Sequence, residues 1–178
     1  MPSHILKETY FDSPLGLMVI IADEKALYLL EFVERKRLEH ELHQLHKIEH
    51  LAVSAGRTQI TEQLEKELDL YFEGQLTEFK TPLHYFGTDF QKKAWKALQK
   101  IPYGKTRSYQ EQAVAIGQPT ACRAVANANA KNPISIVIPC HRIIQSNGTL
   151  GGYGGGVERK QWLLDHEQKY ASMSVQAA

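Results

Sequence analysis

Residues 90–130 read FQKKAWKALQKIPYGKTRSYQEQAVAIGQPTACRAVANANA and contain the signals that set the architecture of the second half of the chain. Apolar residues recur at 90, 94, 95, 98 and 101, which predicts an amphipathic helix. The SYQE at 108–111 fits a capping box, so we expect Ser108 to begin a short helix that Gly117 ends. Residues 118–130 predict a second short helix, with Pro119 in its first turn.

These two short helices, joined by a tight turn around Gly117, are a helix-turn-helix candidate, although any helical hairpin would give the same pattern. The second helix is rich in alanine, and Arg123 is its only long cation between Pro119 and Ala130. Major-groove readers usually offer several Arg, Asn or Gln side chains, and Asn127 and Asn129 are available for that. One arginine among small residues instead favours insertion into a DNA duplex.

The net charge of +1 hides an asymmetry between the two halves of the chain. Residues 91–160 contain 11 Lys or Arg and only two acids, whereas residues 1–90 contain 9 Lys or Arg and 16 Asp or Glu. A solvated surface with chance clustering is the simplest interpretation. An excess of this size next to an acidic half is more typical of a surface that binds a polyanion, most plausibly nucleic acid.

A second informative stretch, ISIVIPCHRII at 134–144, places a cysteine between proline and histidine. The run before Pro139 is apolar and β-branched, which predicts a short buried strand. Cys140 could be an inert buried thiol, or a nucleophile that needs a base to become a thiolate. Adjacent residues of a strand point to opposite faces, so Cys140 and His141 can cooperate only if the chain turns at Pro139.

An acid that orients His141 would have to come from the helix predicted at 157–167, where Asp165 and Glu167 are the candidates. The glycine-rich segment NGTLGGYGGG at 147–156 lacks the pattern of a phosphate-binding loop. It is better suited to letting backbone groups approach a flat ligand, with Tyr153 as a stacking wall.

The first half predicts a smaller α/β domain. Residues 9–32 contain two apolar runs separated by ADEK, as in an antiparallel hairpin. Residues 32–51 and 58–73 predict helices, and 74–88 predict a loop that ends the domain. We therefore expect an α/β protein: a small N-terminal α/β domain with an antiparallel sheet (1–86), a mainly helical C-terminal domain (87–170) and a flexible tail (171–178).

Several function classes are disfavoured by composition. The sequence has no apolar run of the roughly 20 residues that a membrane span needs, and it shows no signal peptide. Two cysteines do not make a disulfide framework, so we expect a cytoplasmic protein with a free thiol.

Four histidines at 40, 43, 46 and 50 share one helical arc and could hold a metal, but a solvated face explains them better.

Residues 132–167, with their Pro-Cys-His-Arg core, resemble the active-site region of the O6-alkylguanine-DNA alkyltransferases, the methylated-DNA–protein-cysteine methyltransferases. Residues 90–130 resemble the helix-turn-helix of that family. The first half is similar only in pattern, as in SPLG at 13–16 and YFEG at 71–74. The resemblance implies repair of O6-alkylguanine, and less well O4-alkylthymine, in double-stranded DNA by one irreversible transfer of the alkyl group to the protein.

The resemblance also implies roles for individual residues. Cys140 would accept the alkyl group, His141 would activate it through a water molecule, and Glu167 would orient His141. Asn132 would brace the turn, and Tyr109 would help to rotate the nucleotide and protonate the leaving guanine. Arg123 would be the finger that fills the space the nucleotide leaves in the base stack. Ala121, Ala124 and Asn127 would contact the DNA. Tyr153, Gly154 and the main chain of Ile143 would surround the flipped base.

No metal, cofactor or membrane is expected, and the protein is expected to act as a monomer. Family members with zinc bind it through Cys and His of the N-terminal domain, and this chain has no cysteine before Cys122. Two alternatives to transfer stay open: a non-catalytic sensor of alkylated bases, and a Cys-His hydrolase. The intact Cys140 weakens the first, and the adjacency of Cys140 and His141 weakens the second.

Overall fold

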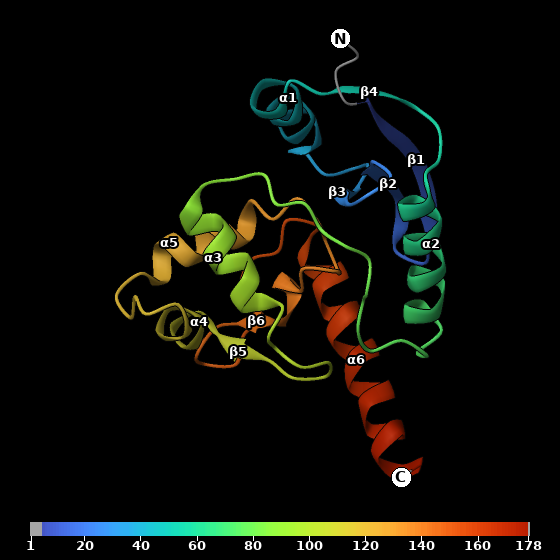
Figure 1. Cartoon of the computed structure of the whole chain (residues 1–178). Coiled ribbons are helices and arrows are strands. Elements are labelled where there is room, and N and C mark those ends of the chain that lie inside the picture. The colour runs from blue at the N-terminus through green and yellow to red at the C-terminus, as the bar shows by residue number, and fades with distance from the viewer. Residues whose placement is uncertain (1–4, 178) are drawn as a thin grey trace. The chain divides into compact units, whose positions relative to one another are not determined.

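The structure is a computed structural model that describes residues 5–177, except for the side chains of residues 48, 49 and 174–177. The chain divides into two compact units, Met1–Phe86 and Gly87–Ala178, which are described separately. The first unit contains a sheet and two helices, and the second is mainly helical (Figure 1). The predicted α/β fold class is therefore confirmed.

The first unit is built on a four-stranded sheet with the strand order β3-β2-β1-β4. Strands β1, β2 and β3 are antiparallel neighbours, whereas β4 pairs parallel with β1. In chain order the elements are β1 (Ile5–Ser13), β2 (Gly16–Ala22), β3 (Leu27–Phe32), α1 (Leu38–Glu49), β4 (Ala52–Ala55) and α2 (Gln59–Phe72).

The predicted hairpin within 9–32 corresponds to β2 and β3, but the sequence did not indicate β1 or β4 as separate strands. Strand β1 contains five polar residues and is partly exposed, so it lacks the continuous apolar run that marks β2. Its turn into β2 is closed by Ser13, whose hydroxyl donates to the Gly16 carbonyl at 2.6 Å. Gly16 has a φ of 121°, which favours glycine at this position.

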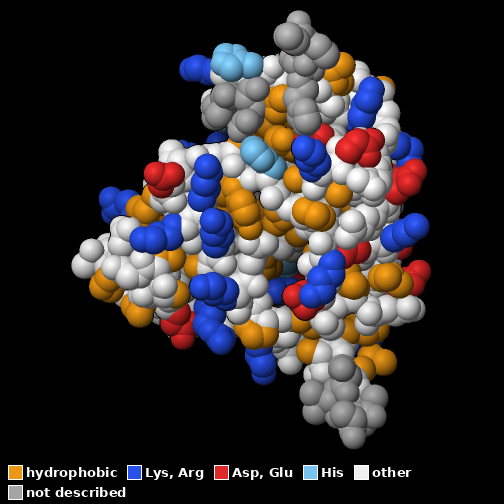
Figure 2. Space-filling model, in the orientation of Figure 1, with side chains coloured by type: hydrophobic (Ala, Val, Ile, Leu, Met, Phe, Trp, Pro, Cys, Tyr) orange, Lys and Arg blue, Asp and Glu red, His pale blue; other side chains and the backbone are white. Residues whose placement is uncertain are grey.

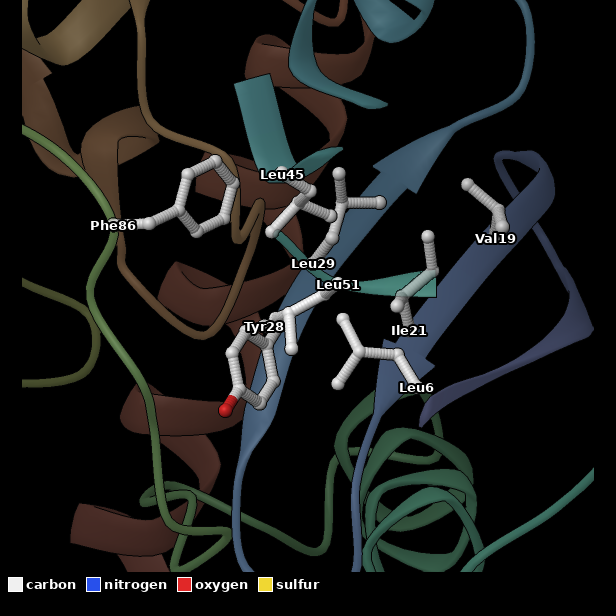
Figure 3. Packing of buried hydrophobic residues seen from close by; sticks show 8 residues of the cluster. All are labelled: Leu6, Val19, Ile21, Tyr28, Leu29, Leu45, Leu51 and Phe86. Atoms are coloured by element: carbon white, nitrogen blue, oxygen red, sulfur yellow. The ribbon is translucent and has the colours of Figure 1, made fainter. Parts of the chain in front are cut away.

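The central strand β2 is buried on both faces, because helices cover the two sides of the sheet. On one face, strand residues such as Leu6, Ile21 and Leu29 pack against Leu45 of α1 and against Phe86 (Figure 3). Since side chains alternate along a strand, Met18 and the other even-numbered residues of β2 lie on the opposite face. Helix α2 contacts β1 and β2 and begins with the capping box of Thr58.

Helix α1 is shorter than the predicted 32–51. The residues before it form turns that place Arg35 against two buried carboxylates, Glu31 of β3 and Glu41 of α1. This ion cluster fixes the segment between β3 and α1, and the helix begins at Leu38. Burial, with the neighbouring Glu31 carboxylate, raises the pKa of Glu41 to about 8.

The second unit consists of short helices around one long helix. In chain order its elements are α3 (Asp89–Leu98), β5 (Arg107–Ser108), α4 (Tyr109–Ala115), α5 (Cys122–Ala130), the single 3₁₀ turn η1 (Cys140–Arg142), β6 (Ile143–Ile144) and α6 (Val157–Ala177). Helix α6 continues to Ala177, so residues 171–177, expected to be a flexible tail, are helical.

Helices α3, α4 and α5 pack on one another, and α4 and α5 are the two helices predicted as a helix-turn-helix. Ala113, Ile116 and Val125 form their shared apolar core. Gln112 of α4 and Asn129 of α5 exchange two amide hydrogen bonds, at 2.9 and 2.7 Å. This reciprocal pair satisfies buried polar groups and so fixes α5 against α4.

The predicted start of the second helix at 118 is wrong by four residues. Residues 118–121 form a turn closed by the Ala121 N–H on the Gln118 carbonyl at 2.9 Å, and α5 begins at Cys122. The Gln110 side chain binds the Pro119 carbonyl at 2.8 Å, which holds Pro119 in the turn between the helices.

Candidate active site and DNA-binding surface

The segment before Cys140 is buried as predicted, but it is a series of turns and not a strand. Asn132 supplies the hydrogen bonds that a neighbouring strand would have given. Its side chain accepts from the Ile134 N–H at 2.9 Å and donates to the Ile138 carbonyl at 2.8 Å and to the Cys140 sulfur at 3.3 Å. Ile136 takes the left-handed conformation, with φ at 72°, inside this loop.

Replacing Asn132 by alanine is expected to lower the free energy of unfolding by about 2–3 kcal/mol, because buried backbone groups lose their partners. Urea denaturation measures this. Asn127→Ala, at an exposed position of α5, is the matched control and should change stability by less than about 0.5 kcal/mol. Equal stability of the two variants would contradict the bracing contacts of Asn132.

The chain turns at Pro139, as cooperation between Cys140 and His141 requires. Residues Cys140–Arg142 form the 3₁₀ turn η1, closed by the Arg142 N–H on the Pro139 carbonyl at 3.0 Å. In this turn Cys140 is partly exposed, whereas the His141 side chain is fully buried. The turn therefore offers the thiol to the outside and directs the imidazole inward.

His141 forms a buried pair with Glu167 of α6, with 2.7 Å between Nε2 and Oε2. Burial alone would raise the pKa of Glu167, but His141 and Arg142 together hold it well below its usual range. The ionised carboxylate accepts a hydrogen bond, so Nε2 of His141 carries a proton, and Nδ1 is the ring nitrogen that does not bind Glu167. Nδ1 is buried and has no hydrogen-bond partner among the described residues.

Arg142 was not indicated by the sequence as a site residue, yet it completes this cluster. Its Nε and one terminal nitrogen bind the two oxygens of Glu167 at 2.7 and 3.1 Å. The other terminal nitrogen binds the Ile101 carbonyl at 2.7 Å. The signal was present in the CHR sequence itself, since a tight turn directs His141 and Arg142 into the same interior. Asp165, the other candidate acid, is exposed and accepts from Gln161 at 2.8 Å.

Tyr109 lies close to Cys140 because the segments that contain them are paired through two short strands. Strand β5, which leads into Tyr109, pairs parallel with β6, which follows η1. Burial raises the pKa of Tyr109, a thiolate at Cys140 would raise it further, and a backbone hydrogen bond of Gly152 opposes both. Gly151 has a φ of 71°, and a Cβ there would lie 3.0 Å from the Tyr109 hydroxyl oxygen. The glycines thus allow the loop backbone to approach Tyr109.

The remaining predicted pocket residues lie on the segments that flank Cys140. Tyr153 is partly buried and Gly154 is exposed in the glycine-rich loop, while Ile143 is fully buried in β6. Lys160, which the sequence analysis did not single out, is fully buried in the first turn of α6. Its ammonium nitrogen donates to the Gly152 carbonyl at 3.1 Å.

The face of α5 that carries the predicted DNA-binding residues is open to solvent. Arg123, Ala124 and Asn127 are exposed and Ala121 is partly exposed, whereas Val125 packs in the core. Exposed cations gather on this unit, and Figure 2 shows a run of Lys and Arg side chains over the region of α3 and β5. Between residues 91 and 160 the exposed cations are Lys93, Lys96, Lys100, Lys105, Arg107, Arg123 and Lys131.

Comparison with known proteins identifies both units. Residues 6–85 match the ribonuclease-like domain of 6-O-methylguanine DNA methyltransferase, and residues 89–169 match its DNA binding domain. The chain belongs to this methyltransferase family.

Individual relatives agree with the family models. A methylated-DNA–protein-cysteine methyltransferase of Mycolicibacterium paratuberculosis is 43% identical over 164 residues, which is 92% of this chain and 93% of that protein. One from Methanosarcina barkeri is also 43% identical, over 89% of this chain and 97% of its own. The crystal structure of Mycobacterium tuberculosis OGT in complex with DNA has a TM-score of 0.78 at 41% identity, over 93% and 94% of the two chains.

All the predicted site residues of this methyltransferase-family chain fall inside the matched DNA binding domain. The structure places Asn132, Cys140 and His141 with Glu167 in one cluster and Arg123 on an exposed helix face. Within the part of the chain that the structure describes, no group of three or more His, Cys, Asp and Glu could hold a metal ion. Nor is any described helix long and apolar enough to cross a bilayer.

Proposed function

We propose that this protein repairs O6-alkylguanine, and less well O4-alkylthymine, in duplex DNA by transferring the alkyl group to Cys140. The observation that carries the proposal is the turn η1, which offers a partly exposed thiol beside a buried His141–Glu167 pair. This arrangement lies in a domain matched to a DNA binding domain. Its relatives are named as methyltransferases that act from methylated DNA to a protein cysteine.

The reaction needs a thiolate and a good leaving group. His141 takes the thiol proton at Nδ1 through a water molecule, and Glu167 stabilises the resulting imidazolium. The Cys140 sulfur then bonds to the alkyl carbon as the carbon–O6 bond breaks and its electron pair stays with guanine. Tyr109 donates a proton to the guanine and regains one from the His141 imidazolium through solvent, so that overall the thiol proton passes to the guanine. A thioether is not hydrolysed, so each molecule reacts once and needs no cofactor.

The alkyl carbon lies within the base stack, so the nucleotide must first leave the duplex, at a cost of a few kcal/mol. Phosphate binding by the exposed cations offsets this cost. Arg123 fills the vacated position, while Ala121, Ala124 and Asn127 lie against the DNA and let α5 approach it closely. Tyr153, the Gly154 N–H and the carbonyls of Cys140 and Ile143 surround the flipped base.

Intact-mass spectrometry tests the proposal directly. The protein is incubated with a duplex that carries a single O6-methylguanine, in excess over the protein. We expect every chain to gain the mass of one CH₂ group, located at Cys140 by peptide mapping. Repeated turnover would contradict the proposal, and so would tight lesion binding without transfer, which is the behaviour of a sensor.

Arg123→Ala should slow repair of duplex DNA by roughly 10–100-fold, because the variant loses part of the few kcal/mol that offsets base flipping. Reaction with free O6-benzylguanine, which requires no flipping, should change less than about twofold. Single-turnover rates with the two substrates measure the contrast. Lys131→Ala, which removes another exposed cation next to α5, is the control: it should weaken duplex binding, but the rate at saturating DNA should change by less than about twofold and the reaction with free O6-benzylguanine should not change. Equal losses for both substrates would count against the finger role.

The proposal includes a monomer that acts in the cytoplasm. Neither Cys122 nor Cys140 is part of a disulfide, which suits a reducing compartment. The transfer needs residues of one chain only, because Asn132, Cys140, His141 and Glu167 lie in one unit.

A further inference from the structure

Lys160 is a buried cation that the proposed transfer chemistry does not use. Its side chain is fully buried at the start of α6, where the neighbouring Leu163 contributes to the apolar core. Burial of an ammonium group is unfavourable, and it lowers the pKa of Lys160 to about 8. An apolar side chain such as methionine would fill this position without that cost, so the charge itself calls for an explanation.

The surroundings of Lys160 connect it to the nucleophile. The hydrogen-bond partner of its ammonium nitrogen is the neutral Gly152 carbonyl, at 3.1 Å, so the positive charge is not cancelled there. A thiolate at Cys140 would interact favourably with the Lys160 ammonium and raise its pKa, against the effect of burial. Because a Coulomb interaction is mutual, the Lys160 ammonium must stabilise the Cys140 thiolate to the same extent.

The other charged and titratable groups around the thiol do not supply this charge. Arg142 is held by both oxygens of Glu167, so these two charges offset each other. His141 donates to that same carboxylate from η1. Tyr109 approaches Cys140 from α4 as a neutral phenol, because its pKa is raised. Lys160 therefore brings a positive charge to Cys140 that no carboxylate within this cluster offsets.

Lys160 is also linked to Tyr109 through Gly152 of the glycine-rich loop. The Gly152 carbonyl accepts from Lys160, and the Gly152 backbone makes a hydrogen bond to Tyr109. We propose that Lys160 is a positioning residue of the alkyl-transfer site, which stabilises the Cys140 thiolate by its charge and holds Gly152 against Tyr109. This inference rests on the proposed role of Cys140 as the nucleophile.

The test measures thiol reactivity without DNA, so it is independent of repair. Cys140 is alkylated with iodoacetamide across a range of pH, and peptide mapping reports Cys140 and Cys122 separately. In Lys160→Met the midpoint of the Cys140 profile should rise by about one pH unit, which slows the reaction near neutral pH about tenfold. The rate at high pH should be undiminished, because a thiolate of higher pKa is intrinsically the stronger nucleophile.

Matched variants separate charge from packing. Lys160→Arg keeps the charge and should retain most of the wild-type midpoint. Arg159→Gln removes the adjacent cation, whose guanidinium binds the Gly155 carbonyl at 3.1 Å, and should leave the Cys140 midpoint unchanged. Cys122 should react alike in all four proteins. An unchanged Cys140 midpoint in Lys160→Met, or an equal shift in Arg159→Gln, would overturn the proposal.

A second measurement keeps the proposal testable if Lys160→Met does not fold. The Lys160 side chain can be titrated by NMR in the wild type and in Cys140→Ser. Since the Cys140 thiolate raises the pKa of Lys160, its removal should lower that pKa. An identical titration in both proteins would overturn the proposal. The proposed function fails by a different observation, the lack of a methyl adduct in the wild type, so the two failures are distinguishable.

Discussion

Cys140→Ser is expected to abolish alkyl transfer, by at least about a thousandfold, while the protein still folds and binds DNA. A hydroxyl is a far weaker acid than a thiol, and the His141–Glu167 pair is arranged to handle a thiol proton. The side chain of serine is close in size, and residue 140 is partly exposed, so little packing is lost. Single-turnover assays with labelled O6-methylguanine in duplex DNA measure the loss.

The chain supplies its own control for this substitution. Cys122, the second free thiol, lies at the start of α5 and binds the Gln110 side chain at 2.9 Å. Cys122→Ser should transfer the alkyl group at a rate within about threefold of the wild type. The Cys140→Ser variant should also hold the lesion longer, because the reaction that removes the alkyl group cannot proceed. Transfer that persists in Cys140→Ser but is lost in Cys122→Ser would reverse the assignment of the nucleophile.

Glu167→Gln is expected to affect both stability and rate, because Glu167 joins two buried side chains. The carboxylate accepts from His141 and, through both oxygens, from Arg142. Without it the guanidinium is a buried charge that lacks its counter-ion, which costs about 3–5 kcal/mol. The His141 imidazolium also loses its stabilising anion, so we expect alkyl transfer to slow by roughly 100-fold or more.

The stabilisation that Glu167 provides is expected to depend on pH, and its direction follows from the pKa of Glu167. The pKa of Glu167 is held below its usual range in the folded protein, so the unfolded state binds more protons in acid. The stabilisation from Glu167 is fully present above the unfolded-state pKa of about 4.3, and it is lost progressively as the pH falls below that value. The difference in unfolding free energy between the wild type and Glu167→Gln should therefore shrink in acid.

Asp165→Asn is the matched control on the same helix. Asp165 is exposed and contacts Gln161, so its replacement should change stability by less than about 0.5 kcal/mol and leave transfer unaffected. Urea denaturation at neutral and acidic pH, together with single-turnover rates, compares the three proteins. If Glu167→Gln behaved like Asp165→Asn, the buried cluster around His141 would not have the importance that its contacts indicate.

Local sequence signals determined the elements whose cause lies within a few residues. The capping box at Ser108 predicted the start of α4, and the structure has Ser108 at the N-cap with Glu111 completing the box. The apolar period of 90–101 predicted α3, whose residues Ala94, Trp95 and Leu98 are buried. Capping and helical periodicity depend on neighbours along the chain, so the sequence alone is sufficient for them.

The sequence misjudged segments whose structure depends on distant partners. ISIVIP has the composition of a strand, but its backbone bonds to itself in turns, such as the Ile138 N–H on the Ile134 carbonyl, and the Asn132 side chain binds its two ends. Helix α1 was predicted too long, because the packing of Arg35 against Glu31 and Glu41 cannot be seen in helical periodicity. In both cases a side chain competes with secondary structure for the backbone of its neighbours.

Some residues of the active site could be identified from the sequence, and others only from the structure. The motif at 139–142 and its resemblance to a known family were enough to select Cys140 and His141 from the sequence. Apart from the family resemblance, only the structure decided between Glu167 and Asp165 as the partner of His141. Only the structure showed that Arg142 and Lys160 belong to the site. Burial and charge pairing are properties of groups that meet in space, and residues 101, 142 and 167 meet only after the chain has folded.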